Sequence, residues 1–472
     1  MKKSCLAAYL LLSMLVGCGS VAAPSETTLP DSSAEMSEET TDDGPIIPEG
    51  TDYGGYEFRV LARGAGKWTR VDMYTEEEVG EALNDAVYKR NLYVSDKLNV
   101  TFSQNTIASD DDLASQAQKS ISAGDDDFDI VWMGSQKLTS LTLSHLFADL
   151  NTIGLDLSNN WWDRKAVENL TINGKTFMTT GDISVIGNYA TYVMAFNKTL
   201  HEQYGLDDVY SLVRDGKWTF DAFAGMARQV SEDLNGNGKY DKDDRFGFMT
   251  YGSDYTGFMF ACGGSFSVPE GDTLVTNYSS ERVISQLTDL AELHRDNSTF
   301  VFPNDEVANK IFLEGRTLFS FRTLINLNFY RDMETDYGIL PMPKYDENQE
   351  EYHCGVHAYG LSLISVPVTA TDPGRTAMIL ELMGYKSKEL LTPAFYEKTL
   401  KGKYFRDEES GEMLDIIFSS RVYDIGYYSN WGNLHTRLEG MSQGAKSDFA
   451  SVFESTRTKV EDSLAKTIEA YT

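Results

Sequence analysis

The chain has 472 residues, 12% of them aromatic, and a formal net charge of −31 at pH 7. This acidic balance argues against nucleic acid or another polyanion as a partner, because phosphate binding needs clustered Lys and Arg. The length exceeds what one hydrophobic core usually supports, and it therefore predicts two lobes.

The N-terminus has the organisation of an export signal. Lys2 and Lys3 precede an almost unbroken apolar stretch at residues 5–17, which has signal-peptide length and is short for a membrane span. The stretch ends in Leu-Val-Gly-Cys, and this resembles the bacterial lipobox, whose cysteine (here Cys18) is acylated. We expect residues 1–17 to be a lipoprotein signal peptide, and palmitate-type chains on Cys18 to anchor the protein on the extracytoplasmic face of the cell membrane. The alternative is an ordinary secretory signal with an incidental cysteine.

A tether is predicted between the anchor and the folded part, at residues 18–52. Residues 20–50 are rich in Ser, Thr, Glu and Asp and contain no aromatic residue, Lys or Arg. Such a segment buries too little apolar surface to fold, and its like charges keep it extended. From Tyr53 onward aromatic residues occur throughout, as in a globular chain.

The first part of the globular region alternates strand and helix patterns. Strands are predicted at 56–63, 99–103 and 128–133, and amphipathic helices at 84–98 and 111–123. This β-α-β-α-β order predicts a mostly parallel sheet with right-handed crossovers. Ligands of such sheets sit beyond the carboxyl ends of the strands, so the loops that carry Trp68 and residues 132–135 are candidate cleft walls.

Later segments also alternate strand and helix patterns, but they do not repeat the sequence of the first part. Thr219 is a good N-cap for a helix at 219–231, whose apolar residues share one face. Further strands are predicted at 192–196, 245–248, 316–321, 337–343 and 359–365, and an amphipathic helix at 447–470. The alternation favours a second α/β lobe.

Four stretches stand in a characteristic order. They read FNKTLHEQYGL at 196–206, DGKWTFDAF at 215–223, FLEGRTLF at 312–319 and YGILPMPK at 337–344. In order and spacing across roughly residues 55–390 they resemble the extracellular solute-binding proteins of ABC importers, of the maltose-binding type. The resemblance implies an α/β, two-lobed periplasmic-binding-protein-like fold of type II, with hinge-joined lobes and a ligand cleft between them. The alternative is an unrelated two-lobed secreted protein.

The resemblance also implies that each lobe is built from two stretches of chain. We expect lobe 1 to contain residues 53–185 plus about 338–385. Lobe 2 is expected to contain about 186–337 plus about 386–472, and the stretch at 337–344 resembles the strand that crosses back between the lobes.

A twelve-residue segment follows the spacing of an EF-hand calcium loop. The predicted ligands are Asp233, Asn235, Asn237, the Lys239 carbonyl, Asp241 and Asp244, with Gly238 at the turn. Two features depart from that pattern: Asp replaces the closing Glu, and a helix and a strand flank the loop in place of two helices. The segment therefore predicts a structural Ca²⁺ ion. Similar loops occur in some members of the resembled family, which supports the metal site. The alternative is an Asn-Gly turn with solvated acids.

Aromatic residues are the candidates for solute contact, because sugars present apolar C–H faces beside hydroxyl rims. The predicted ligand-binding residues are Trp68, Trp132, Ser135, Trp162, Tyr189, Tyr255, Arg322, His357 and Trp431. Trp161 and Tyr359 belong to the same pool of aromatics, and core packing is the alternative for each. The Trp161-Trp162 pair has the further interpretation of a staple that holds a loop on lobe 1, and Arg322 that of a partner for an acid.

Cys262 and Cys354 either form a disulfide or remain as buried thiols. No zinc-type Cys/His spacing, Ser-nucleophile elbow, P-loop or dinucleotide fingerprint stands out in the sequence.

We therefore expect a monomeric binding protein without enzymatic activity, which captures a small solute and delivers it to the permease subunits of an ABC importer. Aromatic richness and the resembled family favour an oligosaccharide. A lipid-anchored glycoside hydrolase stays an alternative, and it would need two carboxylates roughly 5–9.5 Å apart. A calcium-stabilised surface adhesin or scaffold is the other alternative.

Overall fold

The computed structural model describes residues 44–64, 73–330, 333–398 and 409–472. By its contacts, residues 44–472 form one compact unit. The predicted signal peptide, Cys18 and Trp68 lie outside the described residues. Each helix in the described ranges is too short or too polar to span a membrane.

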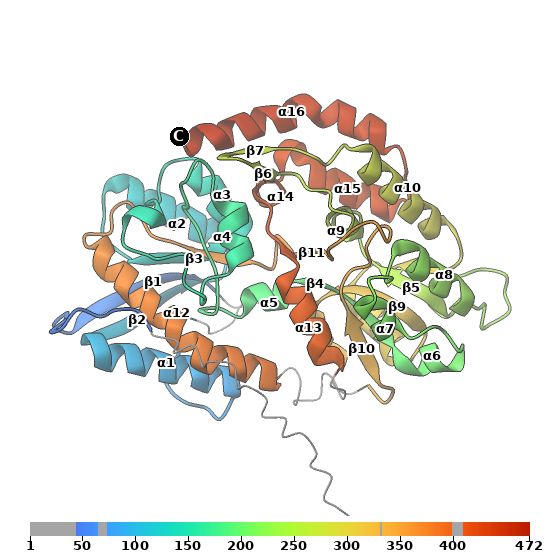
Figure 1. The fold of residues 1–472 in the computed structure, drawn as a ribbon, viewed down its shortest axis with the longest axis horizontal. Coiled ribbons are helices and arrows are strands. Elements are labelled where there is room, and N and C mark those ends of the chain that lie inside the picture. The colour runs from blue at the N-terminus through green and yellow to red at the C-terminus, as the bar shows by residue number, and fades with distance from the viewer. Residues whose placement is uncertain (1–43, 65–72, 331–332, 399–408) are drawn as a thin grey trace, which may run out of the picture. The chain divides into compact units, whose positions relative to one another are not determined.

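A four-stranded sheet organises the first part of the chain (Figure 1). Its order is β12-β3-β1-β2, from β1 (Tyr56–Arg63), β2 (Val100–Ile107), β3 (Ile130–Gly134) and β12 (Ser362–Ser365). β2 and β3 are parallel to β1, whereas β12 is antiparallel to β3. The predicted β-α-β-α-β order and the parallel pairing are confirmed, with α1 (Ala82–Leu98) and α2 (Asp110–Ala123) as the connecting helices.

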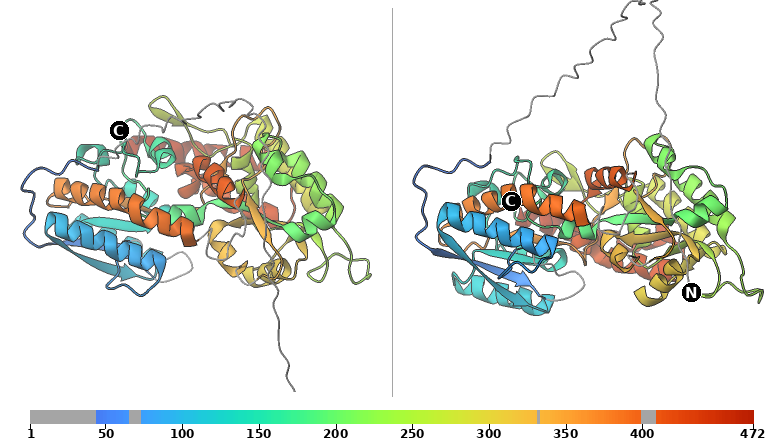
Figure 2. Two further views of the ribbon diagram at one scale, coloured as in Figure 1. Left: turned by 60° about the horizontal axis from the view of Figure 1, so that its bottom comes forward. Right: turned by 90° about the horizontal axis from the view of Figure 1, so that it is seen from below.

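Helices cover both faces of this first sheet. In the right-hand view of Figure 2, α1 and α12 (Pro373–Tyr396) lie on one face and α2 on the other. Local sequence explains the ends of α2: the Ser109 hydroxyl accepts the Asp112 amide at the N-terminus (3.2 Å), and Gly124 ends the helix with φ 83°. The smaller elements nearby are α3 (Ser135–Thr142), η1 (Leu150–Thr152), α4 (Arg164–Leu170) and α5 (Ile186–Ala190).

A five-stranded sheet organises the second part. Its order is β10-β4-β9-β5-β8, from β4 (Tyr192–Asn197), β5 (Phe246–Thr250), β8 (Thr299–Val301), β9 (Thr317–Thr323) and β10 (Tyr337–Leu340). β8 and β9 are parallel to β5, and β4 is antiparallel to both β9 and β10. The predicted helix at 219–231 is confirmed as α8 (Phe220–Val230), with Thr219 as its N-cap.

The other elements of the second part are helical, apart from one hairpin and two short strands. They are α6 (Lys198–Gln203), α7 (Val209–Arg214), α9 (Asp254–Ala261), β6 (Val268–Glu270), β7 (Thr273–Val275), α10 (Glu281–Arg295), α11 (Asp305–Leu313), η2 (Leu324–Tyr330), β11 (Cys354–Gly355), α13 (Glu409–Ser419), β13 (Arg421–Val422), α14 (Ile425–Tyr428), η4 (Trp431–Asn433), α15 (Leu434–Gln443) and α16 (Phe449–Ala470). The predicted C-terminal helix is confirmed as α16, which packs against α10 and η4.

The return of the chain to the first sheet differs from the boundary of about 338 that the sequence suggested. β10 pairs antiparallel with β4, so residues 337–340 belong to the second sheet. The chain rejoins the first sheet only at β12, and α12, which ends at Tyr396, then packs against α1. All four residues of β10 are buried, which is why this apolar strand remains inside the second core.

Two described segments connect the sheets and run beside each other. Residues 186–192 lead into β4, and residues 341–361 lead to β12. Thr191 forms an antiparallel bridge with Val356, and the His357 amide donates to the Ala190 carbonyl (2.9 Å). The second of these segments contains β11, and a third stretch of chain, β13, pairs with β11 in parallel. The predicted crossing connections are thus present, although the segment after β10, and not β10 itself, makes the return.

Cys262 and Cys354 are both buried free thiols, so the interpretation without a disulfide is confirmed. Burial raises the pKa of each thiol to about 11, which keeps both protonated at neutral pH.

Candidate functional site

The strand ends of both sheets meet the crossing segments. In the first sheet, β1 ends at Arg63, and antiparallel β12 starts opposite Gly134, so the residues that precede β12 lie at the same edge. In the second sheet, Thr323 at the end of β9 pairs with Tyr192, where the crossing segment enters β4. We use the name strand-end face for Arg63, Gln136, Tyr251, Ser253, Tyr359 and Glu439, which lie at these edges and on the adjacent helix α15.

Tyr359 is the most exposed aromatic ring of the strand-end face, with 39% of its surface accessible. Its carbonyl accepts a hydrogen bond from Arg63 Nη1 (3.1 Å), and its side chain is hydrogen-bonded to Gln136. Arg63 is held in turn by an ion pair with Asp110 (2.7 Å). Tyr359 is thus held by the last side chain of β1 and by a side chain that follows β3.

Polar groups of helix α15, in the second part of the fold, also lie near the Tyr359 ring. His435 of α15 lies 5.9 Å from that ring, between centroids, and its Nε2 lies 3.4 Å from Glu439. Glu439 accepts a hydrogen bond from the Ser253 hydroxyl (3.0 Å), and burial raises the pKa of its carboxyl. Ser253 follows β5, so groups from both sheets converge around one exposed ring.

Aromatic side chains also line the edge of the second sheet. The Tyr251 ring lies 5.6 Å from Phe302 and 5.4 Å from Phe321, between centroids. The Arg322 guanidinium stacks over Phe302 at 4.6 Å. Phe302, Phe321 and Arg322 are buried. The half-buried Tyr251 ring and the exposed Tyr359 ring are therefore the aromatic surface available here to the C–H faces of a hydroxyl-rich solute.

Five of the predicted ligand-binding residues are packed inside the structure. Trp132, Ser135, Tyr255, Arg322 and Trp431 each expose 2% of their surface or less. β3 runs through Trp132 to Gly134, so this ring lies in the sheet core and not in the expected loop. Arg322 pairs with Asp305 (3.2 Å) and donates to the Tyr330 hydroxyl (2.7 Å), as its alternative interpretation anticipated.

The other three described residues of this set, Trp162, Tyr189 and His357, are buried as well, with 4%, 4% and 6% of their surface exposed. The His357 ring lies 5.4 Å from the Tyr359 ring, between centroids. Tyr189 packs edge-to-face on Phe395 (5.1 Å). Sequence reasoning did not single out Gln136, Ser253 or Glu439, because nothing in their local pattern distinguishes them from the many other polar residues of the chain.

The Trp161-Trp162 pair is confirmed as a staple. Both indole nitrogens donate to the Glu381 carboxylate of α12, at 2.7 Å from Trp161 and 3.3 Å from Trp162. The same carboxylate accepts the Asp156 amide (2.6 Å) and the Asn159 side chain (3.2 Å). One buried acid therefore holds the whole 156–162 loop on the first part of the fold.

The predicted calcium loop lies between α8 and β5, as expected. Asp233 accepts the Gly236 and Gly238 amides (2.7 and 2.8 Å), and Asn237 accepts the Lys239 amide (2.7 Å). The carboxylate of buried Asp244 accepts two backbone amides (3.0 and 2.8 Å).

The oxygen atoms of this loop belong to carboxylate, amide and carbonyl groups, which are the types of ligand that a hard cation such as Ca²⁺ prefers. Among the described residues, no three His, Cys, Asp or Glu side chains gather closely enough to hold a metal ion by themselves. A cation here would rely on the Asn side chains and the Lys239 carbonyl as well. The calcium ion stays a prediction.

His435 makes stability depend on pH in a definite direction. Burial lowers its pKa to about 3, from an ordinary value near 6.5, so protonation favours the unfolded chain. The stability of the fold is therefore undiminished by His435 above pH 6.5, and protonation of His435 in the unfolded chain lowers the free energy of unfolding progressively as pH falls toward 3. At pH 5 the loss is about 2 kcal/mol relative to pH 8. Urea unfolding at both values should show this slope, and His435→Gln, compared with the native chain, should flatten it by that amount.

Comparison with known proteins identifies a family. The profile of the family described as bacterial extracellular solute-binding protein matches residues 94–388. No curated protein matches the sequence significantly.

Solved structures share the fold at low sequence identity. An ABC substrate-binding protein from Listeria monocytogenes, in complex with cycloalternan, matches with TM-score 0.56 and 14% identity over 87% of this chain and 99% of that chain. A cyclo/maltodextrin-binding protein complexed with maltotetraose matches with TM-score 0.60 and 15% identity over 86% and 97%. The maltose/maltodextrin-binding domain from Bdellovibrio bacteriovorus, bound to maltotriose, matches with TM-score 0.55 and 14% identity over 87% and 100%.

Proposed function

We propose a function for a chain that belongs to the family of bacterial extracellular solute-binding proteins: it captures an oligosaccharide at the strand-end face and delivers it to an ABC importer. The observation that carries this proposal is the exposed Tyr359 residue, which contacts Arg63 and Gln136 of one part and lies near His435 and Glu439 of the other. Structures with the same fold have been solved with cycloalternan, maltotetraose and maltotriose, which supports the choice of solute class.

Solute capture would act on the crossing segments. A molecule that contacts Tyr359 and Glu439 touches residues attached to both sheets, so it interacts differently with each hinge angle. Such differential contact shifts the population toward the arrangement that it bridges. Delivery to a permease would follow from recognition of that arrangement.

We propose binding without turnover. Family membership supports this, and so does the chemistry of the strand-end face, where Asp110 is held in an ion pair by Arg63 (2.7 Å). A glycoside hydrolase would need a second carboxyl group placed to act with Glu439. Incubation with maltotetraose should leave the sugar intact, and hydrolysis products detected by chromatography would favour the enzyme.

An extracytoplasmic location follows from the family. Attachment to the membrane through acylated Cys18, with residues 18–52 as a spacer, is a proposal that the leader sequence supports. Substitution Cys18→Ser should release the protein into the medium, whereas the native chain should stay with the membrane fraction.

The solute proposal is tested by calorimetric titration of the purified chain with maltotriose, maltotetraose and cycloalternan. We expect saturable binding of at least one of them. At one hundred times its dissociation constant a ligand stabilises the folded state by about 2.7 kcal/mol, which thermal unfolding would register. If none of the three sugars gave heat or a thermal shift, the oligosaccharide proposal would fail.

We also propose that the loop at 233–244 binds a structural Ca²⁺ ion. Extracellular loops of this type bind at roughly 10⁻⁴ to 10⁻³ M, so about 10 mM Ca²⁺ should stabilise the fold by about 1.5–3 kcal/mol. Thermal unfolding with Ca²⁺ and with EDTA measures the difference. The variant Asp233→Ala should remove the response to Ca²⁺, whereas Asp215→Ala, on an exposed side chain outside the loop, should keep it. Equal stability of the native chain in Ca²⁺ and EDTA would refute the site.

A further inference from the structure

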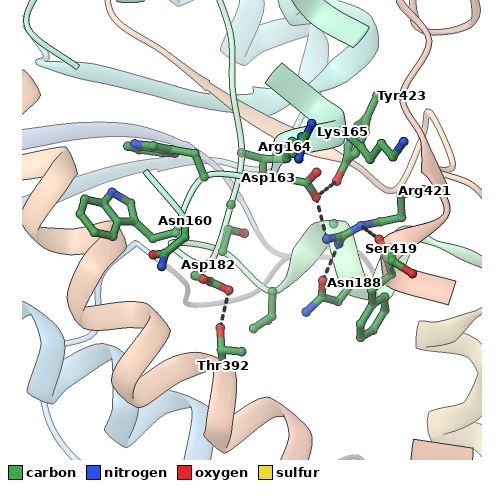
Figure 3. A pocket seen from close by; sticks show the side chains of 18 of the residues that line it. Asn160, Asp163, Arg164, Lys165, Asp182, Asn188, Thr392, Ser419, Arg421 and Tyr423 are labelled. Carbon is green, nitrogen blue, oxygen red and sulfur yellow. Dashed lines mark hydrogen bonds and ion pairs between the residues drawn. The ribbon is translucent and has the colours of Figure 1, made fainter. Parts of the chain in front are cut away.

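We propose that a cavity apart from the strand-end face binds a small, neutral, polyhydroxylated molecule of about one or two sugar rings. This cavity, the α4–β13 pocket, has a volume of about 590 Å³ and includes Asn160, Asp163, Asp182, Asn188, Ser419 and Arg421 in its lining (Figure 3). Its volume lies within the range of ligand-binding pockets, roughly 300–1,000 Å³. The pocket shares no residue with the strand-end face, so it is a separate site.

The charges that line the pocket cancel. Three acids (Asp163, Glu168 and Asp182) stand against three bases (Arg164, Lys165 and Arg421). Most are already paired: Arg421 with Asp163 at 2.6 Å, and Arg164 with Glu168 at 2.7 Å. A phosphate or another polyanion would have to displace these pairs, and a free cation would meet no excess of negative charge. Electrostatics therefore favour a neutral occupant.

The walls are rigidly positioned around the pocket. Besides its ion pair, Arg421 donates through Nη1 to Asn188 Oδ1 (2.6 Å), and the Tyr423 hydroxyl donates to Asp163 (2.7 Å). Asp163 and Arg421 are nearly buried, with 6% and 15% of their side chains exposed. Such a network fixes donors and acceptors before a ligand arrives, which lowers the entropic cost of binding.

Polar groups that can meet hydroxyls surround this network. Figure 3 places Asn160 and Asp182 on one side of the space and Asn188 and Ser419 on the other. Asp182 accepts a hydrogen bond from the Thr392 hydroxyl (2.7 Å). Burial raises the pKa of Asp182, and the hydrogen bond from Thr392 and the charge of Arg421 oppose that effect. Hydroxyl groups both donate and accept, so they complement the amide, hydroxyl and carboxylate groups of this lining.

The walls come from both sides of the crossing segments. α4 and Thr392 of α12 belong to the first part of the fold, and α5 lies in a crossing segment. Phe418 and Ser419 end α13, which packs against β10 of the second sheet. An occupant would therefore touch elements of both parts at a place remote in sequence from Tyr359.

The test uses the full chain and two probes: D-glucose for the α4–β13 pocket and maltotetraose for the strand-end face. The variant Ser419→Trp places a bulky ring at an exposed pocket residue, and Asp182→Asn changes the central carboxyl while keeping an acceptor for Thr392. We expect the native chain to bind D-glucose, and each variant to weaken that binding about tenfold or more. Maltotetraose affinity should stay within about twofold, and unchanged melting temperatures would show that both variants fold.

Tyr359→Ala is the reciprocal control and should weaken maltotetraose while it leaves D-glucose binding intact. The pocket proposal is overturned if the native chain does not bind D-glucose. It is also overturned if D-glucose binding survives in both pocket variants, or is lost in Tyr359→Ala, because the sugar would then occupy the strand-end face only. Failure of maltotetraose to bind would count against the proposed function and not against the pocket, so the two failures are distinguishable.

Discussion

Substitution of Glu381 by alanine is expected to lower the free energy of unfolding by about 3–5 kcal/mol, because it leaves several buried donors without an acceptor. Glu381 exposes only 4% of its surface and accepts hydrogen bonds from Trp161 (2.7 Å), Trp162 (3.3 Å) and the Asp156 amide (2.6 Å). Each buried donor that loses its partner costs about 1–3 kcal/mol, and partial relaxation of the loop limits the sum. Equilibrium unfolding in urea measures the change.

Glu381→Gln is the matched control. It keeps the shape of the side chain and one carbonyl acceptor, so we expect it to lose only about 1–2 kcal/mol. Burial raises the pKa of Glu381, so ionising this group costs energy in the folded state, and the neutral amide avoids that cost. If the alanine and glutamine variants were equally stable, the staple would not depend on the acceptor.

Substitution of Tyr359 by alanine is expected to weaken the binding of maltotetraose about thirtyfold, equivalent to about 2 kcal/mol. The ring is the exposed aromatic surface on which a sugar face would stack, and the groups around it are polar: Arg63, Gln136 and Glu439. Loss of the ring removes the apolar contact and leaves only hydrogen bonds, which exchange with water at little net gain. Calorimetric titration compares the two chains.

Tyr359→Phe separates the ring from its hydroxyl. It keeps the stacking surface and loses only the hydrogen bond with Gln136, so we expect a change of about threefold or less. Because Tyr359 is 39% exposed, its removal should leave the unfolding free energy within about 1 kcal/mol of the native value. Unchanged maltotetraose affinity in the alanine variant would place the sugar elsewhere.

Local patterns predicted the elements well where the signal lies in neighbouring residues. The strand predicted at 56–63 is β1 with the same bounds, and Thr219 caps α8 as its hydroxyl and the following apolar face indicated. These features depend on alternation, helical spacing and capping, all of which act over a few residues. The sequence assigned no element to α10 or to α12, although α12 holds the staple that fixes Trp161 and Trp162.

Side-chain roles were harder to predict than elements. Trp132 and Trp431 belong to residue types that serve sugar sites, yet both are buried, because large aromatics fill cores as readily as they line clefts. Glu439 and Ser253 carry no local signal at all. Their contact at 3.0 Å exists because α15 packs against α9, which begins just after Ser253.

The sequence by itself determined the class of the protein: an α/β chain with alternating elements, whose motifs resemble solute-binding proteins, as the family match at residues 94–388 bears out. Those properties depend on local hydrogen bonding and on the spacing of apolar residues, which neighbouring positions encode. Only the tertiary structure decided that Tyr359 faces His435, that β10 stays in the second sheet, and that Asp163 pairs with Arg421. These contacts form between segments far apart in the sequence, and they depend on which surfaces pack together in the folded chain. The residues next to each partner in the sequence do not specify that packing.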